Sequence, residues 1–315
     1  MSAHMAPAAA TAPDQDGAGR PRRWRGALRA RTLVIGTPYL WLLVFFLLPF
    51  LIVLRISFAE MEGARIGSTF QLQSYVTLLH DEIYLSTYAQ SLMYAGITTL
   101  ICLFIGYPFA YFMARVSATV QPLLLMGVML PFWTSFLLRV YAWKGLLDAQ
   151  TGWVGRFLVD VHADSLLLPL GLIAAPGQYM YTPFSLVVGM VYTYLPFMVL
   201  PLFGTLSKLD LQLLEAAQDL GATPWQAFWR ITVPISKAGI IAGAMLVFIP
   251  CVGEYVIPEL LGGPETLMIG RVLWDEFFSN NDWPMASSIA VTMVLLIIVP
   301  LAIFNDSQAK AAAAR

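Results

Sequence analysis

One carboxylate, Glu254, interrupts an apolar stretch that runs from Ala238 to Pro258. Tyr255 adjoins it, and Glu259 lies a little further along the chain. A carboxylate beside an aromatic face binds ammonium groups through its charge and through the ring quadrupole. Glu254, Tyr255 and Glu259 are therefore candidate ligands for an organic cation. The alternative is structural, because a charge within an apolar stretch also needs a partner, which can be an arginine or a backbone donor across a subunit interface.

The sequence contains no set of residues suited to hydrolysis or phosphoryl transfer. It has no Gly-Lys pair and hence no G-x4-G-K-[ST] phosphate loop. It has no H-E-x-x-H or G-x-S-x-G motif, and its histidines, His4, His80 and His162, lie outside the apolar stretches. Cys102 and Cys251 lie inside them, which predicts small buried apolar side chains rather than a disulfide. We expect no enzyme active site, no bound cofactor and no metal site.

The composition requires a membrane around these residues. The chain is 58% hydrophobic and only 12% charged, with a mean hydropathy of +0.71. Soluble domains are about a quarter charged, so this chain could not cover a water-exposed surface. The formal net charge of -1 argues against nucleic acid as a partner. The lipid bilayer is the expected surrounding.

Uncharged stretches long enough to cross a bilayer predict six membrane helices, since about 20 apolar residues are needed for each. The uncharged stretch from Ser165 to Ser207 is divided by Pro176 and Gly177. Its first piece, up to Ala175, is too short to cross and is expected to be a membrane-surface or re-entrant segment. The predicted spans are Leu33–Leu54, Ile83–Ala114, Val116–Leu138, Phe184–Leu206, Ala238–Pro258 and Trp283–Asn305.

The predicted fold class is an all-α polytopic membrane bundle. We expect a basic, disordered tail over 1–32, a first membrane helix over 33–58, a core of five helices over 83–305 and a tail over 306–315. Positive charge favours the cytoplasmic side of a membrane. The tail before the first span is rich in arginine, which places the N-terminus and the loop 207–237 in the cytoplasm. The arginines concerned are Arg20, Arg22, Arg23, Arg25, Arg29 and Arg31.

The loop 207–237 has the signals of two short helices joined by a tight turn. Apolar residues recur on one helical face before Gly221, which can take positive φ and end that helix. Thr223 is a good N-cap, Pro224 suits the first helical position, and Gln226 can complete a capping box. A second short helix with an aromatic edge at Trp225 should follow. The pattern predicts a helix-turn-helix that projects from the membrane.

The order of residues in this loop resembles the EAA loop of binding-protein-dependent ABC importers, whose pattern is E-A-A-x3-G-x9-I-x-L-P. Here the pattern begins at Glu215 and ends at Pro234, and Val233 replaces the Leu. The resemblance implies a type I permease fold in which this loop is a cytoplasmic coupling helix. It also implies a cytoplasmic ATPase dimer, which holds ATP and Mg. The residues implied in coupling are Glu215, Ala216, Ala217, Asp219, Gly221, Pro224, Trp225, Ile231 and Pro234.

Further segments are similar to the first permease subunit of polyamine importers, and most similar to the putrescine type. The resemblance implies a polyamine as cargo, with putrescine ahead of spermidine, and location in the bacterial inner membrane. It implies a periplasmic polyamine-binding protein and a second, homologous permease as partners, and it adds Trp133 and Tyr194 to the candidate path. The alternative is a self-contained ion-coupled carrier or channel for a small organic cation. The segments are Pro131–Ser135, Arg139–Trp143, Val191–Phe197, Glu254–Pro264, Ile269–Trp274 and Asp282–Pro284.

Overall fold

The computed structural model describes residues 34–313 apart from residues 64 and 68, so the predicted tail 1–32 lies outside the described residues. The chain divides into two units, residues 1–53 and 54–315.

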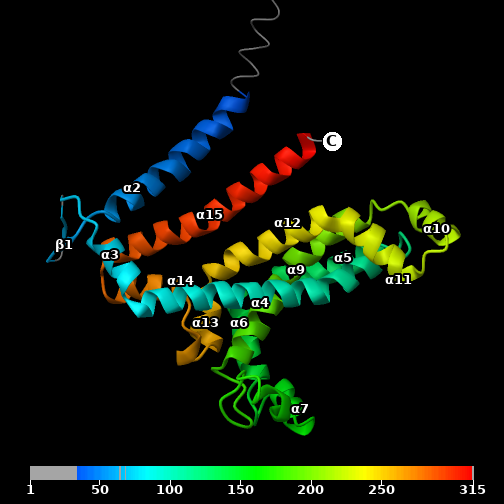
Figure 1. The fold of residues 1–315 in the computed structure, drawn as a ribbon. Helices are drawn as coiled ribbons and strands as arrows, with labels where there is room; N and C mark the ends of the chain where they lie inside the picture. The colour runs from blue at the N-terminus through cyan, green and yellow to red at the C-terminus, as the bar shows by residue number, and fades with distance from the viewer. Residues whose placement is uncertain (1–33, 64, 68, 314–315) are drawn as a thin grey trace, which may run out of the picture. The chain divides into compact units, whose positions relative to one another are not determined.

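The described part of the first unit is helical. A helix runs from Val34 to Ile56 and includes the π-turn η1 (Leu43–Leu47) and α2 (Leu48–Ile56), shown in blue in Figure 1. Its large apolar side chains are exposed, as a lipid-facing helix requires. The first span is therefore confirmed as a helix of sufficient length and apolarity.

Three long helices form the centre of the second unit. They are α4 (Glu82–Met113), α9 (Pro183–Leu206) and α12 (Val233–Val252), and they pack against one another (Figure 1). Their buried apolar side chains form one core, in which Cys102 and Cys251 are fully buried as predicted. The bounds of α4 and α9 agree with the second and fourth predicted spans to within a residue.

Glycines bring α9 and α12 close together. A Cβ atom at Gly239 would collide with the Thr205 side chain and lie 2.9 Å from the Pro201 carbonyl oxygen. A Cβ atom at Gly243 would lie 2.7 Å from the sulfur of Met198. Small residues at such positions allow the close backbone approach on which helix association in lipid depends. These two contacts hold α9 and α12 together near the loop 207–237.

The third predicted span, Val116–Leu138, is wrong as a single straight helix. The chain forms α5 (Gln121–Met129) and the 3₁₀ turn η2 (Leu130–Trp133), then bends by 92° before α6 (Phe136–Leu146). Thr134 at the break is extended, with ψ of 153°. Pro131 cannot donate a backbone hydrogen bond, which favours a break of the helical ladder near it. The two pieces together can form one broken span.

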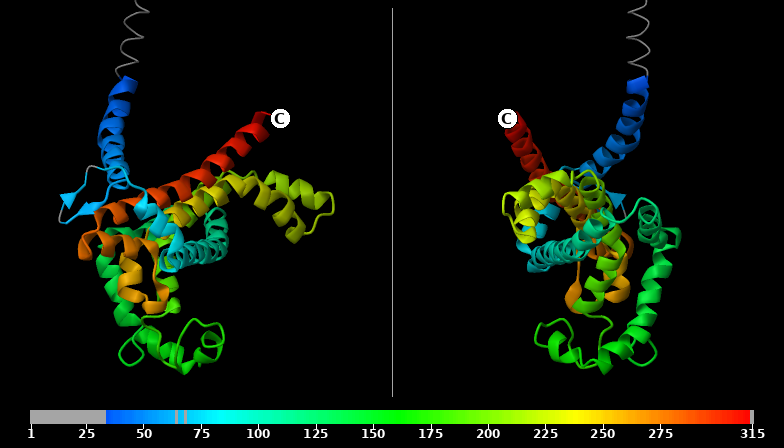
Figure 2. Two further views of the ribbon diagram at one scale, coloured as in Figure 1. Left: turned by 60° about the vertical axis from the view of Figure 1, so that its left-hand side comes forward. Right: turned by 90° about the vertical axis from the view of Figure 1, so that its right-hand side faces the viewer.

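The segment between α6 and α9 contains only short helices, so its apolar part has no helix long enough to cross a membrane. A turn after α6 is closed by Asp148, whose Oδ1 accepts hydrogen bonds from the backbone N–H groups of Gln150 (2.9 Å) and Thr151 (2.7 Å). These donors, with the Thr151 hydroxyl, hold the pKa of the Asp148 carboxyl below its usual value. Figure 2 shows this segment extending away from the central helices. The short helices are α7 (Trp153–Asp160) and α8 (Asp164–Leu167).

The chain between α12 and the last helix forms a series of short elements at the end of the bundle. The last helix, α15 (Trp283–Ala313), begins at the predicted residue but continues beyond Asn305. The predicted tail 306–315 is therefore helical up to Ala313, because its alanines favour helix. The short elements are α13 (Val256–Leu261), η4 (Pro264–Thr266), α14 (Ile269–Trp274) and η5 (Asp275–Ser279). Earlier in the chain, β1 (Met61–Glu62) pairs with β2 (Arg65–Ile66), and α3 (Gln73–His80) follows.

Among the described residues, four helices are long and apolar enough to cross a membrane, and the bent pair α5–α6 brings the number to five. The side chains of α15 are described only over Trp283–Ile298, and this apolar part is shorter than the four helices that can cross a membrane. These elements correspond in order to the six predicted spans, and those of the second unit pack into the predicted helical membrane bundle.

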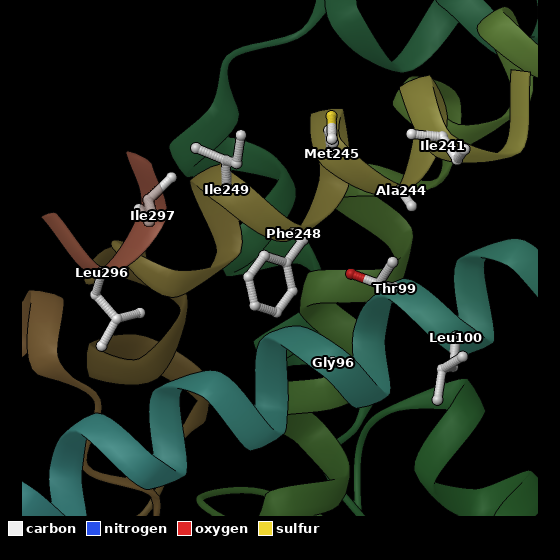
Figure 3. Close-up of a pocket in the computed structure, with 10 residues that line it drawn as sticks. All are labelled: Gly96, Thr99, Leu100, Ile241, Ala244, Met245, Phe248, Ile249, Leu296 and Ile297. Atoms are coloured by element: carbon white, nitrogen blue, oxygen red, sulfur yellow. The ribbon is translucent and has the colours of Figure 1, made fainter. Parts of the chain in front are cut away.

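An apolar cavity of about 390 Å³ opens between α4, α12 and α15 (Figure 3). Gly96 and Phe248 lie in its wall, and Leu296 comes from α15. Thr99 contributes the one polar side chain among the lining residues. Such a surface suits lipid tails or another membrane helix, and it has no group that could hold a charged cargo.

Candidate functional site

The loop 207–237 forms the predicted tight turn, and we refer to these residues as the coupling hairpin. Its first helix is α10 (Gln212–Asp219). Gly221 ends it with φ of +87°. The backbone N–H of Gly221 donates to the Gln218 carbonyl (2.8 Å), and that of Ala222 donates to the Ala217 carbonyl (2.9 Å). The predicted positive φ at Gly221 is confirmed.

The start of the second helix is capped as predicted. The backbone N–H of Gln226 donates to the Thr223 hydroxyl (3.3 Å), and the Thr223 N–H donates to the Gln226 side-chain oxygen (3.0 Å). Pro224 occupies the first turn. This reciprocal pair satisfies two N–H groups that a helix start would leave unbonded. The hairpin geometry is thus set by its own local sequence.

The second helix of the hairpin is not a separate short helix, which corrects the prediction. α11 (Pro224–Ala227), the π-turn η3 (Phe228–Thr232) and α12 form one continuous helix, Pro224–Val252. The charges before Ala238 marked the expected start of the membrane span, but charged residues do not end a helix. The π-turn η3 lies directly before Val233 and Pro234 in this helix.

The tip of the hairpin presents apolar side chains to the surroundings. Leu220 is 90% exposed and Trp225 is 69% exposed. The indole of Trp225 also contacts the rings of Phe228 and Trp229 at centroid distances of 6.0 and 5.6 Å. An exposed apolar cluster on a polar-rimmed loop marks a protein contact surface. Of the nine predicted coupling residues, Ala217 and Ile231 are half-buried and the other seven are exposed, and all nine lie in this hairpin.

A polar cavity of about 330 Å³ lies behind the hairpin, next to the end of α4. Glu215 and Arg115 both line it, and the Arg115 guanidinium lies 4.0 Å from the centre of the Tyr111 ring. Thr232 is fully buried in the same wall, and its hydroxyl has no hydrogen-bond partner among the described residues. No local sequence signal connects Arg115, Tyr111 or Thr232 with the hairpin, so these residues could not be predicted.

Glu254 lies next to Gly253, the C-cap of α12, and is 9% exposed. Its Oε2 accepts a hydrogen bond of 2.5 Å from the Tyr194 hydroxyl on α9. Its Oε1 accepts from the backbone N–H groups of Tyr255 (3.2 Å) and Val256 (3.0 Å). The structure thus brings two candidate path residues, Glu254 and Tyr194, into direct contact. These donors belong to the same chain as Glu254, so the alternative partner across a subunit interface is untested, and a role of Glu254 in the path stays a prediction.

The other acidic candidate, Glu259, is half-exposed and forms an ion pair with Arg271, at 2.7 Å between Oε2 and Nε. Asp275 lies 4.0 Å from the same guanidinium. Tyr255 stacks on Trp274, with centroids 4.6 Å apart and ring planes at 8°. Negative charge and aromatic faces therefore meet on α13 and α14, which could hold an organic cation.

Trp133 is 77% exposed and lies on η2, at the bend of the third predicted span. The other candidate path residues lie on or next to α9, α12 and α13, so Trp133 belongs to a different element. The partners of Tyr255 and Glu259, which are Trp274 and Arg271, come from a later helix, and no local sequence signal predicts these contacts. Within the described residues, no group of His, Cys, Asp or Glu could hold a metal ion.

Comparison with known proteins gives a family and close relatives. Residues 102–310 match the family of binding-protein-dependent transport system inner membrane components. The chain is 40% identical over 265 residues to the spermidine/putrescine transport system permease protein PotB of Escherichia coli K12, covering 84% of this chain and 92% of the relative. It is 37% identical over 273 residues to PotB of Haemophilus influenzae, covering 86% and 92%. An inner membrane ABC transporter permease protein of Escherichia coli, YdcU, is 32% identical over 216 residues, covering 68% of each chain.

Solved structures show the same fold at low sequence identity. A bacterial ABC transporter that imports the acidic polysaccharide alginate matches with a TM-score of 0.64 and 18% identity, covering 92% of this chain and 99% of that chain. The alginate transporter in complex with its pentasaccharide-bound periplasmic protein matches with a TM-score of 0.61 and 19% identity, covering 89% and 94%. Members of the matched family are non-catalytic transmembrane subunits of ABC importers. The chain belongs to the family of inner membrane permeases of binding-protein-dependent transport systems.

Proposed function

We propose that this chain is the permease subunit of an ATP-driven importer of a polyamine. The observation that supports the energy source is the coupling hairpin, whose exposed tip is rigidly turned at Gly221 and capped at Thr223. A separate ATPase dimer would bind this tip and supply ATP and Mg. Closure of that dimer would displace α9 and α12, because the hairpin joins these two helices.

The cargo proposal rests on the relatives and on one cluster of side chains. The PotB proteins are named for spermidine and putrescine. In this chain, the half-exposed carboxylate of Glu259, which is shared with Arg271, and the stacked rings of Tyr255 and Trp274 present negative charge and aromatic groups to a short aliphatic dication. We place putrescine ahead of spermidine on the motif resemblance described above. Trp133, exposed at the bend, is a further candidate contact on the path.

The proposed complex has three other kinds of component. Two ATPase subunits would lie on the cytoplasmic side with the hairpin and the N-terminus, as the arginine-rich tail favours. A second, homologous permease would complete the passage through the inner membrane. A periplasmic polyamine-binding protein would deliver cargo to the opposite side.

The test is purification of the chain from membranes that contain its natural partners, followed by reconstitution in liposomes. We expect an ATPase, a second permease and a binding protein to co-purify, and uptake of labelled putrescine to require internal ATP. Uptake by this chain alone without nucleotide would contradict the proposal and favour an ion-coupled carrier or channel. Stimulation of ATP hydrolysis by another cargo class, with none by putrescine or spermidine, would overturn the polyamine assignment.

Glu259→Gln tests the proposed cargo contact. We expect about fivefold slower uptake of putrescine, because a charge pair at a partly exposed site contributes about 1 kcal/mol. Basal ATP hydrolysis should stay unchanged. The matched control is Glu265→Gln, which removes the same charge from an exposed position on η4. Equal uptake by the two variants would exclude Glu259 from the path.

A further inference from the structure

The hydrogen bond between Tyr194 and Glu254, which we call the Tyr194–Glu254 bridge, joins the two helices that carry the coupling hairpin. Tyr194 comes from α9, which leads into the hairpin. Glu254 follows the helix Pro224–Val252, which leads out of it. The bridge therefore links α9 to the end of α12 that lies away from the hairpin, so the two helices are connected both by the hairpin and by this hydrogen bond.

The carboxylate of Glu254 is already fully engaged by this chain. Oε2 accepts from the Tyr194 hydroxyl, and Oε1 accepts from the N–H groups of Tyr255 and Val256 at the start of α13. With 9% of the residue exposed, little of the carboxylate can meet an ammonium group. A buried carboxylate is stable when its lone pairs are satisfied in this way. The geometry therefore favours a mechanical task over direct contact with the cargo.

Other close contacts extend the same connection along the bundle. Gly239 and Gly243 hold α12 against α9 nearer the hairpin. Beyond the bridge, the Ser185 hydroxyl on α9 donates to the Leu261 carbonyl of α13 (2.6 Å). A Cβ atom at Gly270 of α14 would lie 2.6 Å from the carbonyl oxygen of Glu254. The segment around Glu254, between the end of α12 and the start of α13, is therefore in contact with α9, α13 and α14.

We propose that Glu254 is a positioning residue for transport: the Tyr194–Glu254 bridge makes α9, α12 and the start of α13 move as one body. Displacement of the hairpin then reaches α13 and α14, where Tyr255, Trp274 and Glu259 lie. The inference rests on the proposed ATP-driven import. It assigns to Glu254 no contact with the cargo.

Three variants in the complete reconstituted complex test this role. Glu254→Gln keeps an acceptor oxygen for the backbone N–H groups and can donate an N–H to the Tyr194 hydroxyl. We expect it to retain uptake within about threefold of the wild type. Glu254→Ala loses every contact, and we expect about tenfold less cargo imported per ATP hydrolysed, with the half-saturating concentration of loaded binding protein unchanged. Tyr194→Phe loses one contact and should fall between them, at about threefold.

A distance measurement separates transmission of motion from simple stability. Spin labels at the exposed residues Gln218 of α10 and Glu265 of η4 should report a nucleotide-dependent change in the wild type and in Glu254→Gln. That change should be lost in Glu254→Ala. Full coupling in Glu254→Ala, or loss of uptake with a raised half-saturating concentration in Glu254→Gln, would overturn the proposal. If Glu254→Ala does not assemble, Tyr194→Phe decides, and its normal coupling would equally overturn it.

The wild-type complex serves as a control that distinguishes failure of the proposed function from failure of the proposed role of the bridge. Uptake by the wild type that does not require ATP would count against the proposed function itself. ATP-dependent wild-type uptake together with normal Glu254→Ala coupling would count only against the role of the bridge.

Discussion

Gly221→Val should reduce ATP-driven uptake at least about tenfold while leaving the protein in the membrane. Gly221 has φ of +87°, and a Cβ atom there would meet no other atom within 4 Å. The cost of the substitution is therefore backbone strain alone, which a β-branched residue cannot relieve at positive φ. Strain of about 1–3 kcal/mol is enough to shift the backbone at residue 221 to another conformation, which would reorient the hairpin tip relative to its partner. The measurement is putrescine uptake by the reconstituted complex, normalised to the amount of permease.

Gly221→Asn is the matched control for this prediction, because asparagine adopts the left-handed region more readily than other residues with side chains. It should retain most of the uptake. Glu215→Ala should lose uptake without any effect on the turn, since Glu215 lies within α10 and is exposed. Normal transport by Gly221→Val and Glu215→Ala together would show that this hairpin does not transmit the action of an ATPase.

Gly239→Leu should prevent the bundle from forming its native packing. Its side chain would enter space that Thr205 and the Pro201 carbonyl occupy. Overpacking of this kind typically costs about 1–3 kcal/mol, and here a backbone carbonyl stands in the way and cannot rotate aside. We expect a lower melting temperature in detergent, little folded protein in the membrane and no uptake.

Gly204→Leu provides the comparison for Gly239→Leu on the neighbouring helix. A Cβ atom at Gly204 meets nothing within 4 Å, so the same added volume should be tolerated there. Thermal unfolding followed by tryptophan fluorescence would compare the two. Equal melting temperatures would show that the close approach of α9 and α12 contributes little to stability.

Local features of the hairpin could be predicted because their causes are local. The turn at Gly221 follows from a side chain that is absent, and the cap at Thr223 from a partner three positions away at Gln226. The ends of α4 were likewise marked by the charges of Glu82 and Arg115. In each case the decisive residues are neighbours in the sequence.

Features that depend on direction or on distant partners could not be predicted. An uncharged stretch shows that a segment can lie in lipid but not where it turns, so the 92° bend after Trp133 was missed. Glu254 drew attention as an isolated charge, yet its partner Tyr194 is 60 residues away and was known only as part of a family-like segment. The pairing of Glu259 with Arg271 was missed for the same reason.

The exposure of Leu220 has a consequence for how cells must produce this protein. A leucine that is 90% exposed at the hairpin tip would be covered only once the ATPase is bound. In the proposed complex, permease synthesised in excess over its ATPase would leave this apolar side chain uncovered, and chaperones and quality-control proteases recognise exposed apolar side chains. Balanced translation of the two chains, or degradation of the surplus, is the result we expect from this one uncovered side chain.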